Sequence, residues 1–147
     1  MGKISYDADV VLWSREQAEA LRAGRFEDLD IEHLADEIED VGKSEKRELA
    51  SRMATILAHL LKWRFQPDRR GNSWLGTIKE QRAGIDIALE ETPSLRGDLN
   101  SDKWLTRVWS IAVARAVAET GFPETAFPTA CPWTTDQILS PDWAPEA

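Results

Sequence analysis

Residues 44–66, with the sequence SEKRELASRMATILAHLLKWRFQ, carry the apolar pattern that decides the fold. Large apolar side chains recur there every three or four residues, which is the period of one face of an α-helix. Ser44 is placed to cap the first turn and Pro67 to stop the last one. The apolar stripe is wide, and this predicts a central helix with neighbours on two sides. Its members are Leu49, Met53, Ile56, Leu57, Leu60, Leu61 and Phe65.

The same period predicts further helices in the proline-free segments on either side. The expected helices cover residues 14–23, 30–41, 44–66, 73–91 and 101–119, with a short turn over 134–139. Ser14 is the expected N-cap of the first helix and Gly24 its C-terminal residue, while Gly42 is expected to end or bend the second. Thr134 and Gln137 have the spacing of a capping box.

No segment alternates apolar and polar residues as a strand would. The sequence therefore predicts an all-α fold. We expect one domain over residues 1–147, a multi-helix bundle of about four to five main helices with a proline-rich C-terminal arm.

Composition narrows the class of protein. The 147 residues are 42% hydrophobic and 30% charged, which fits one soluble globular domain. The formal net charge of −8 opposes nucleic-acid binding unless a basic face is concentrated somewhere. Cys131 is the only cysteine, the N-terminal residues lack the apolar core of a signal peptide, and no apolar stretch is long enough to span a bilayer. We expect a cytoplasmic protein without a membrane partner.

Residues 30–41 combine an apolar stripe with an acidic face. The stripe consists of Ile31, Leu34, Ala35, Ile38 and Val41. Glu32, Asp36 and Asp40 follow one another at i, i+4 spacing and repel, so a cationic partner would relieve this helix.

His33 lies beside Asp36, Glu37 and Asp40, a set with the donor types that hard metal ions take. A run of charge on a helix is more often a solvated face, and helical spacing puts His33 on that face. The sequence also lacks the glycine loops of phosphate and dinucleotide sites, paired zinc-type cysteines and a nucleophile elbow. We predict no metal site, no cofactor and no catalytic residue, although metal binding by this acidic cluster stays open.

Residues 62–82 form a basic and aromatic segment, with six Lys and Arg against two Asp and Glu. Together with the nearby histidine it supplies a candidate functional surface of His59, Lys62, Trp63, Arg64, Arg69, Arg70, Trp74 and Arg82. Such a segment can neutralise phosphates and stack bases, or it can pair with the acidic helix over residues 30–40. We favour the second interpretation and predict a salt bridge between Glu37 and Arg82, because arginine stays charged and binds a carboxylate bidentately.

The helix over residues 101–119 is apolar on nearly all sides, and one small bundle has difficulty burying both faces. The candidate interface comprises Trp104, Trp109, Val113 and Val117. A homodimer would cover it through an isologous contact and is the favoured prediction. The alternative is that the tail folds back and covers this face with Phe122, Phe127 and Trp133.

Short motifs along nearly the whole chain resemble one bacterial family. They include Tyr6-Asp7-Ala8-Asp9, Trp13, Gln17-Ala18, Leu29-Asp30, Asp36-Glu37-Ile38-Glu39, His59-Leu60-Leu61-Lys62-Trp63, Gln66-Pro67, Ser73-Trp74, Gln81-Arg82 and Cys131-Pro132-Trp133-Thr134. The chain is thereby similar to domain-of-unknown-function family 29. The resemblance implies an all-helical fold and carries no established activity, so no catalytic residue is transferred.

The function expected from these observations is that of a noncatalytic helical interaction or scaffold protein with an unknown protein partner. The alternative is an accessory enzyme or a toxin–antitoxin-like nucleic-acid-binding factor, which would need His59 and the cations of residues 62–82 to converge in one cleft.

Overall fold

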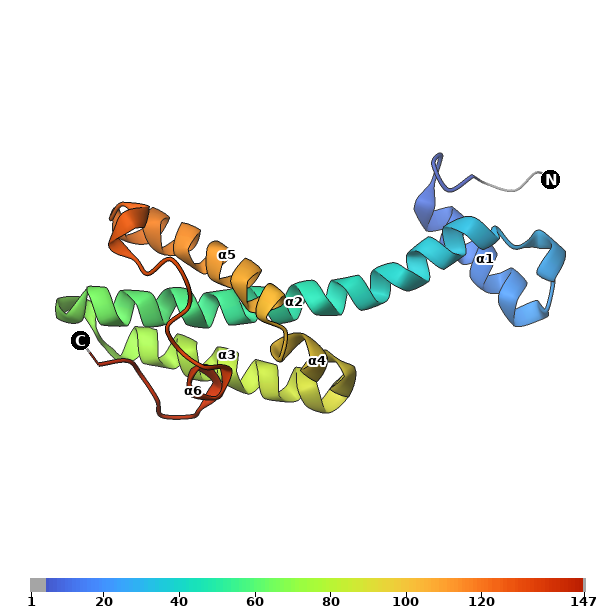
Figure 1. The fold of residues 1–147 in the computed structure, drawn as a ribbon. Helices are drawn as coiled ribbons and strands as arrows, with labels where there is room; N and C mark the ends of the chain where they lie inside the picture. The colour runs from blue at the N-terminus through green and yellow to red at the C-terminus, as the bar shows by residue number, and fades with distance from the viewer. Residues whose placement is uncertain (1–4, 147) are drawn as a thin grey trace. The chain divides into compact units, whose positions relative to one another are not determined.

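The computed structural model describes residues 5–146, whose regular structure is entirely helical (Figure 1). The α-helices are α1 (Val10–Ala23), α2 (Ile31–Phe65), α3 (Asn72–Glu91), α4 (Arg96–Leu99), α5 (Asp102–Thr120) and α6 (Thr135–Leu139). Short 3₁₀ turns lie at Phe26–Asp28, Pro67–Arg69, Pro93–Leu95 and Glu124–Ala126. The all-α class is confirmed. Over these residues, no helix combines the length and apolar character needed to cross a lipid bilayer.

Local capping chemistry explains most helix ends. Ser101 accepts a hydrogen bond from the Trp104 backbone N–H at 3.3 Å, and Gly121 ends α5 with φ of 75°. Thr134 and Gln137 form the predicted capping box of α6. The predicted cap of α1 is wrong, because the helix begins at Val10 and Asp9 accepts the Leu12 N–H at 3.0 Å.

α2 does not end at Gly42 but continues as one α-helix from Ile31 to Phe65. Gly42 lacks the positive φ of a helix-ending glycine. A glycine in a helix interior costs only about 1 kcal/mol relative to alanine, and the residues after it are strong helix formers. Ser44, predicted to cap a new helix, therefore lies inside α2.

Internal contacts group the chain into two compact units. Unit 1 is Met1–Glu45, which contains α1 and the first part of α2, and unit 2 is Lys46–Ala147, which contains the rest. The hydrophobic core cluster found in residues 5–146 lies wholly in unit 2.

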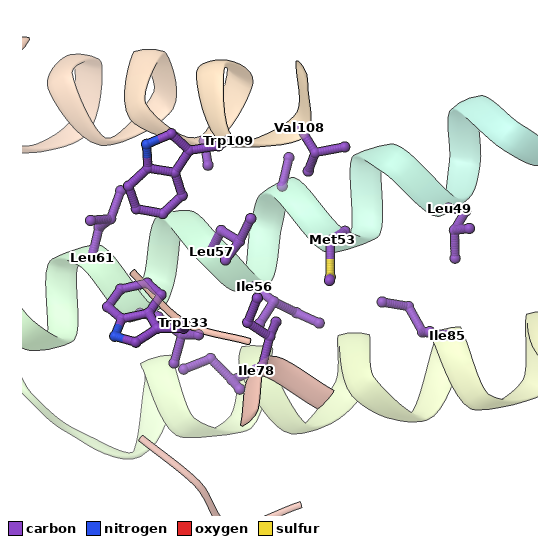
Figure 2. Packing of buried hydrophobic residues seen from close by; sticks show 14 of the residues in the cluster. Leu49, Met53, Ile56, Leu57, Leu61, Ile78, Ile85, Val108, Trp109 and Trp133 are labelled. Carbon is purple, nitrogen blue, oxygen red and sulfur yellow. The ribbon is translucent and has the colours of Figure 1, made fainter. Parts of the chain in front are cut away.

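The core of unit 2 is built around α2, as the wide stripe predicted. Its stripe residues from Leu49 to Leu61 are at most 1% exposed. They pack against Ile78 and Ile85 of α3 on one side and against Val108 of α5 on the other, and Figure 2 shows these side chains pointing into the space between the three helices. Helix α2 is thus the central helix of this unit.

The C-terminal arm after α5 is an ordered part of unit 2. It returns along the helices through α6, as Figure 1 shows in red, and buries Phe127, Trp133 and Ile138 in the core. Trp133 meets Trp109 of α5 edge-on at 5.8 Å between ring centroids. The proline-rich arm predicted from the sequence therefore completes the core.

Candidate interaction surface

Lys62 is buried and His59 is half-buried in unit 2. The Lys62 ammonium lies 2.7 Å from a carboxylate oxygen of Glu119 and 5.2 Å from the centre of the Trp74 ring. His59 Nδ1 lies 2.9 Å from the Thr55 carbonyl oxygen. Burial lowers the pKa of His59, and the neighbouring Lys62 charge acts in the same direction. The fold thus favours the neutral form of His59, and the carboxylate of Glu119 balances the positive charge of Lys62.

In the turn after α2, the next aromatic and basic residues contact one another. Arg70 donates from Nε to the Trp63 carbonyl at 2.6 Å, and its guanidinium stacks 5.1 Å from the centre of the Trp63 ring. The guanidinium of Arg64 lies over Phe65 at 5.2 Å, while Arg69 is exposed. These contacts stabilise the turn between α2 and α3.

Arg82 is 8% exposed and holds the C-terminal arm against α3. It donates from Nε to the Ile138 carbonyl at 2.8 Å, from Nη1 to Pro141 at 3.4 Å and from Nη2 to Trp143 at 2.8 Å. Burial lowers its pKa, opposed by the charge of Asp142. Within unit 1, Glu37 accepts a hydrogen bond from the Tyr6 hydroxyl. Each member of the predicted Glu37–Arg82 pair therefore has a different partner.

Half of the cations in the basic segment have partners within unit 2. Three of its six cations, Lys62, Arg70 and Arg82, are bound to a carboxylate or to backbone carbonyls of the same unit. The remaining cations lie in separate places along α2, α3 and the turn between them.

The α5 face predicted to need a second subunit is covered by the arm. Trp109 and Val113 are 3% and 7% exposed, and the Trp109 indole donates to the Pro128 carbonyl at 3.1 Å. Trp104 and Val117 are half-buried against the core. The arm thus covers Trp109 and Val113, as the alternative expected, and the homodimer stays a prediction.

An apolar groove of about 340 Å³ lies in unit 1, between α1 and α2. Its α1 wall consists of Val10, Val11, Trp13, Ser14, Ala18 and Leu21, and its α2 wall of Leu34 and Glu37. Val11 is 59% exposed, and Val10 and Leu21 are each 48% exposed. These aliphatic side chains line an open surface and not a core.

The exposed apolar side chains of the described residues are concentrated in unit 1. Of the eleven large hydrophobic residues exposed in residues 5–146, eight belong to this smaller unit. They are Val10, Val11, Leu12, Leu21, Phe26, Ile31, Ile38 and Val41. Helix α1 covers the flank of α2 that carries His33, Leu34 and Glu37, which are half-buried, and leaves Ile31 and Ile38 of the apolar stripe open.

The net negative charge of the protein is also concentrated in unit 1. Residues 1–45 contain 13 Asp and Glu against 5 Lys and Arg, a net charge of −8, whereas residues 46–147 contain 13 of each. The whole formal charge of the chain therefore belongs to unit 1. The sequence contained this signal, which appears once the charge is counted separately for each unit.

A cluster of aromatic and polar side chains supports one wall of the groove. Tyr6 stacks on His33 at 4.3 Å and meets Trp13 edge-on at 5.0 Å. Asp30 accepts from the Trp13 indole at 3.0 Å and lies 2.8 Å from His33 Nδ1. His33, predicted to be solvated, keeps 37% of its side chain exposed and is also in contact with Tyr6 and Asp30. Trp13 and Glu37 belong to both the cluster and the groove.

The cluster changes the titration of its members. The hydrogen bond with Asp30 raises the pKa of His33, against a smaller opposing effect of burial. Burial tends to raise the pKa of Asp30, but hydrogen bonds from His33 and Trp13 outweigh it and lower that pKa. The arrangement favours an imidazolium–carboxylate pair.

Asp36 and Asp40, the other members of the acidic set, are exposed. Over the residues that the structure describes, no three or more His, Cys, Asp or Glu side chains are grouped to hold a metal ion.

Comparison with known proteins places this architecture in a family. A family model described as a domain of unknown function, DUF29, matches residues 5–144. No curated protein and no solved structure matches the chain. The matched range covers Tyr6 and Trp13 of the unit 1 cluster as well as Trp133 of the arm. The chain therefore belongs to the DUF29 family.

Proposed function

We propose that this protein is a noncatalytic helical interaction protein that binds a protein partner through the groove between α1 and α2 of unit 1. One observation carries the proposal: eight of the eleven exposed large hydrophobic residues described belong to this unit, and three of them line the groove. Exposed apolar side chains gathered in one groove are typical of binding sites.

The small number of exposed apolar side chains in unit 2 supports this choice of surface. Its described residues expose only Leu75, Ile87 and Ile111 among large hydrophobics, and the arm covers Trp109 and Val113. Three of the six cations of the basic segment, which the nucleic-acid alternative needed, are engaged in internal contacts.

A different protein fits the groove better than a second copy of this chain. Two units that each carry a net charge of −8 repel when they approach face to face. Homodimerisation through this face is therefore opposed by charge, and the proposal is of a heterologous partner. A cytoplasmic location, expected from the single cysteine, belongs to the same proposal.

Quantitative affinity isolation from cells of the source organism tests the proposal. Tagged wild-type protein is compared with a Val11→Ser, Leu21→Ser double variant and with Ile87→Ser, which changes an exposed residue of unit 2. We expect one or more proteins to be recovered with wild type and Ile87→Ser and lost with the double variant. Equal recovery with all three would reject the groove as the binding surface.

A further inference from the structure

We propose that the groove of unit 1 takes a cationic amphipathic helix of the partner protein. This inference rests on the proposed function and adds the chemistry of the partner. It follows from the shape of the groove and from the charge around it.

The groove has the length and shape to take one helix. The α1 wall runs from Val10 to Leu21, about 16 Å at 1.5 Å per residue, or roughly three helical turns. Ser14 and Ala18, one turn apart, are the small residues of this wall, and Val10, Val11 and Leu21 stand at its ends. A helix with aliphatic residues at i, i+3 or i+4, and i+7 can place one of them over the small residues and the others against the ends.

The charge decides the polar face of that helix. Residues 31–42 of α2 contain Glu32, Asp36, Glu37, Glu39 and Asp40 and no Lys or Arg. The next cation, Lys43, lies 4.0 Å from Glu39. Of these five carboxylates, Glu37 is the one in the groove lining, so the net charge of −8 on unit 1 as a whole is what favours lysine or arginine on the polar face of a bound helix.

Model peptides of about 18 residues, long enough to span the groove, test this inference on the full chain. One peptide places leucine at helical spacing with lysine elsewhere, and its isomer replaces every lysine with glutamate. Binding is followed by fluorescence anisotropy of the labelled peptide. We expect the lysine peptide to bind, with a Kd about tenfold weaker when salt is raised from about 0.05 M to 0.5 M, and the glutamate peptide not to bind.

Variants separate the two contributions. Val11→Ser with Leu21→Ser should weaken binding of the lysine peptide about tenfold, Asp36→Asn with Asp40→Asn about threefold, and Ile87→Ser not at all. Equal binding of both peptides would overturn the inference, as would binding that the acidic variants lose and the groove variants keep. Self-association of the chain through the groove, seen in sedimentation, would also overturn it.

The two proposals fail separately. If cells yield a partner that depends on Val11 and Leu21 but contacts them with an uncharged or acidic segment, the cationic helix is wrong and the proposed function stands. If no partner depends on the groove, the proposed function itself is wrong.

Discussion

Replacing Arg82 with methionine tests how much the C-terminal arm contributes to the stability of unit 2. The substitution keeps the apolar stem of the side chain and removes three N–H donors, two of them at 2.8 Å from their carbonyl oxygens. A hydrogen bond with a charged partner contributes about 1.5–3 kcal/mol, and desolvation of the guanidinium offsets part of that gain. Since Ile138 is fully buried, its carbonyl is left without a partner, and we expect Arg82→Met to lower the free energy of unfolding by about 3 kcal/mol.

Urea unfolding followed by tryptophan fluorescence measures this loss, and limited proteolysis reports on the arm. Arg107→Met, at an exposed position of α5, is the matched control and should stay within about 0.5 kcal/mol of wild type. Arg82→Lys should recover only part of the loss, because one ammonium cannot reproduce the fork that reaches three carbonyls. A stability of Arg82→Met equal to that of Arg107→Met, with the arm still resistant to protease, would refute the reasoning.

Three further predictions concern other parts of the chain. Trp109→Ala should cost about 3–5 kcal/mol and expose the arm to protease, while the sedimentation coefficient stays that of wild type; a change from dimer to monomer would contradict this. In an NMR titration assigned with glutamine variants, His33 should titrate above pH 6.5 and His59 below it, and the reverse order would contradict the described contacts. The stabilisation from His33 is therefore full below pH 6.5 and lost as pH rises through its raised pKa, whereas that from Asp30 is full above pH 3.8 and lost as pH falls through its lowered pKa. Gly42→Ala should stabilise the protein by up to about 1 kcal/mol in a urea titration, because the residue is inside a continuous helix, and a loss of stability would mean that the helix ends there.

The sequence predicted the features that depend on neighbours along the chain. The stripe around Met53 and Leu57 identified the central helix, and the helix predicted over residues 101–119 is α5, Asp102–Thr120. Each of these depends on residues within a few positions of one another, where helical spacing determines which side chains meet.

The predictions that the structure corrects concern helix ends, where small terms balance, and the contacts that the sequence did not reveal join distant segments. The carbonyls that accept from Arg82 belong to residues 56 to 61 positions later, and a backbone carbonyl has no residue-type signature. At Gly42 the penalty of about 1 kcal/mol was smaller than the stability of the surrounding helix.

Part of the candidate surface could be predicted from the sequence. The stripe that includes Ile31 and Ile38 and the acidic run beside it could be read from residue order. Its exposure could not, because exposure depends on which flank of α2 the short helix α1 covers. Tyr6, Trp13 and Asp30 carried the family resemblance, but their contact with His33 required the fold.

Photo-crosslinking from within the groove tests the central claim most directly. A benzophenone amino acid in place of Val11 is compared, in cells of the source organism, with the same label in place of Ile87; the two native side chains are 59% and 54% exposed. We predict a discrete adduct with another protein from position 11 and none from position 87. No adduct from position 11, or the same adducts from both positions, would contradict the assignment of the groove as a protein-binding surface.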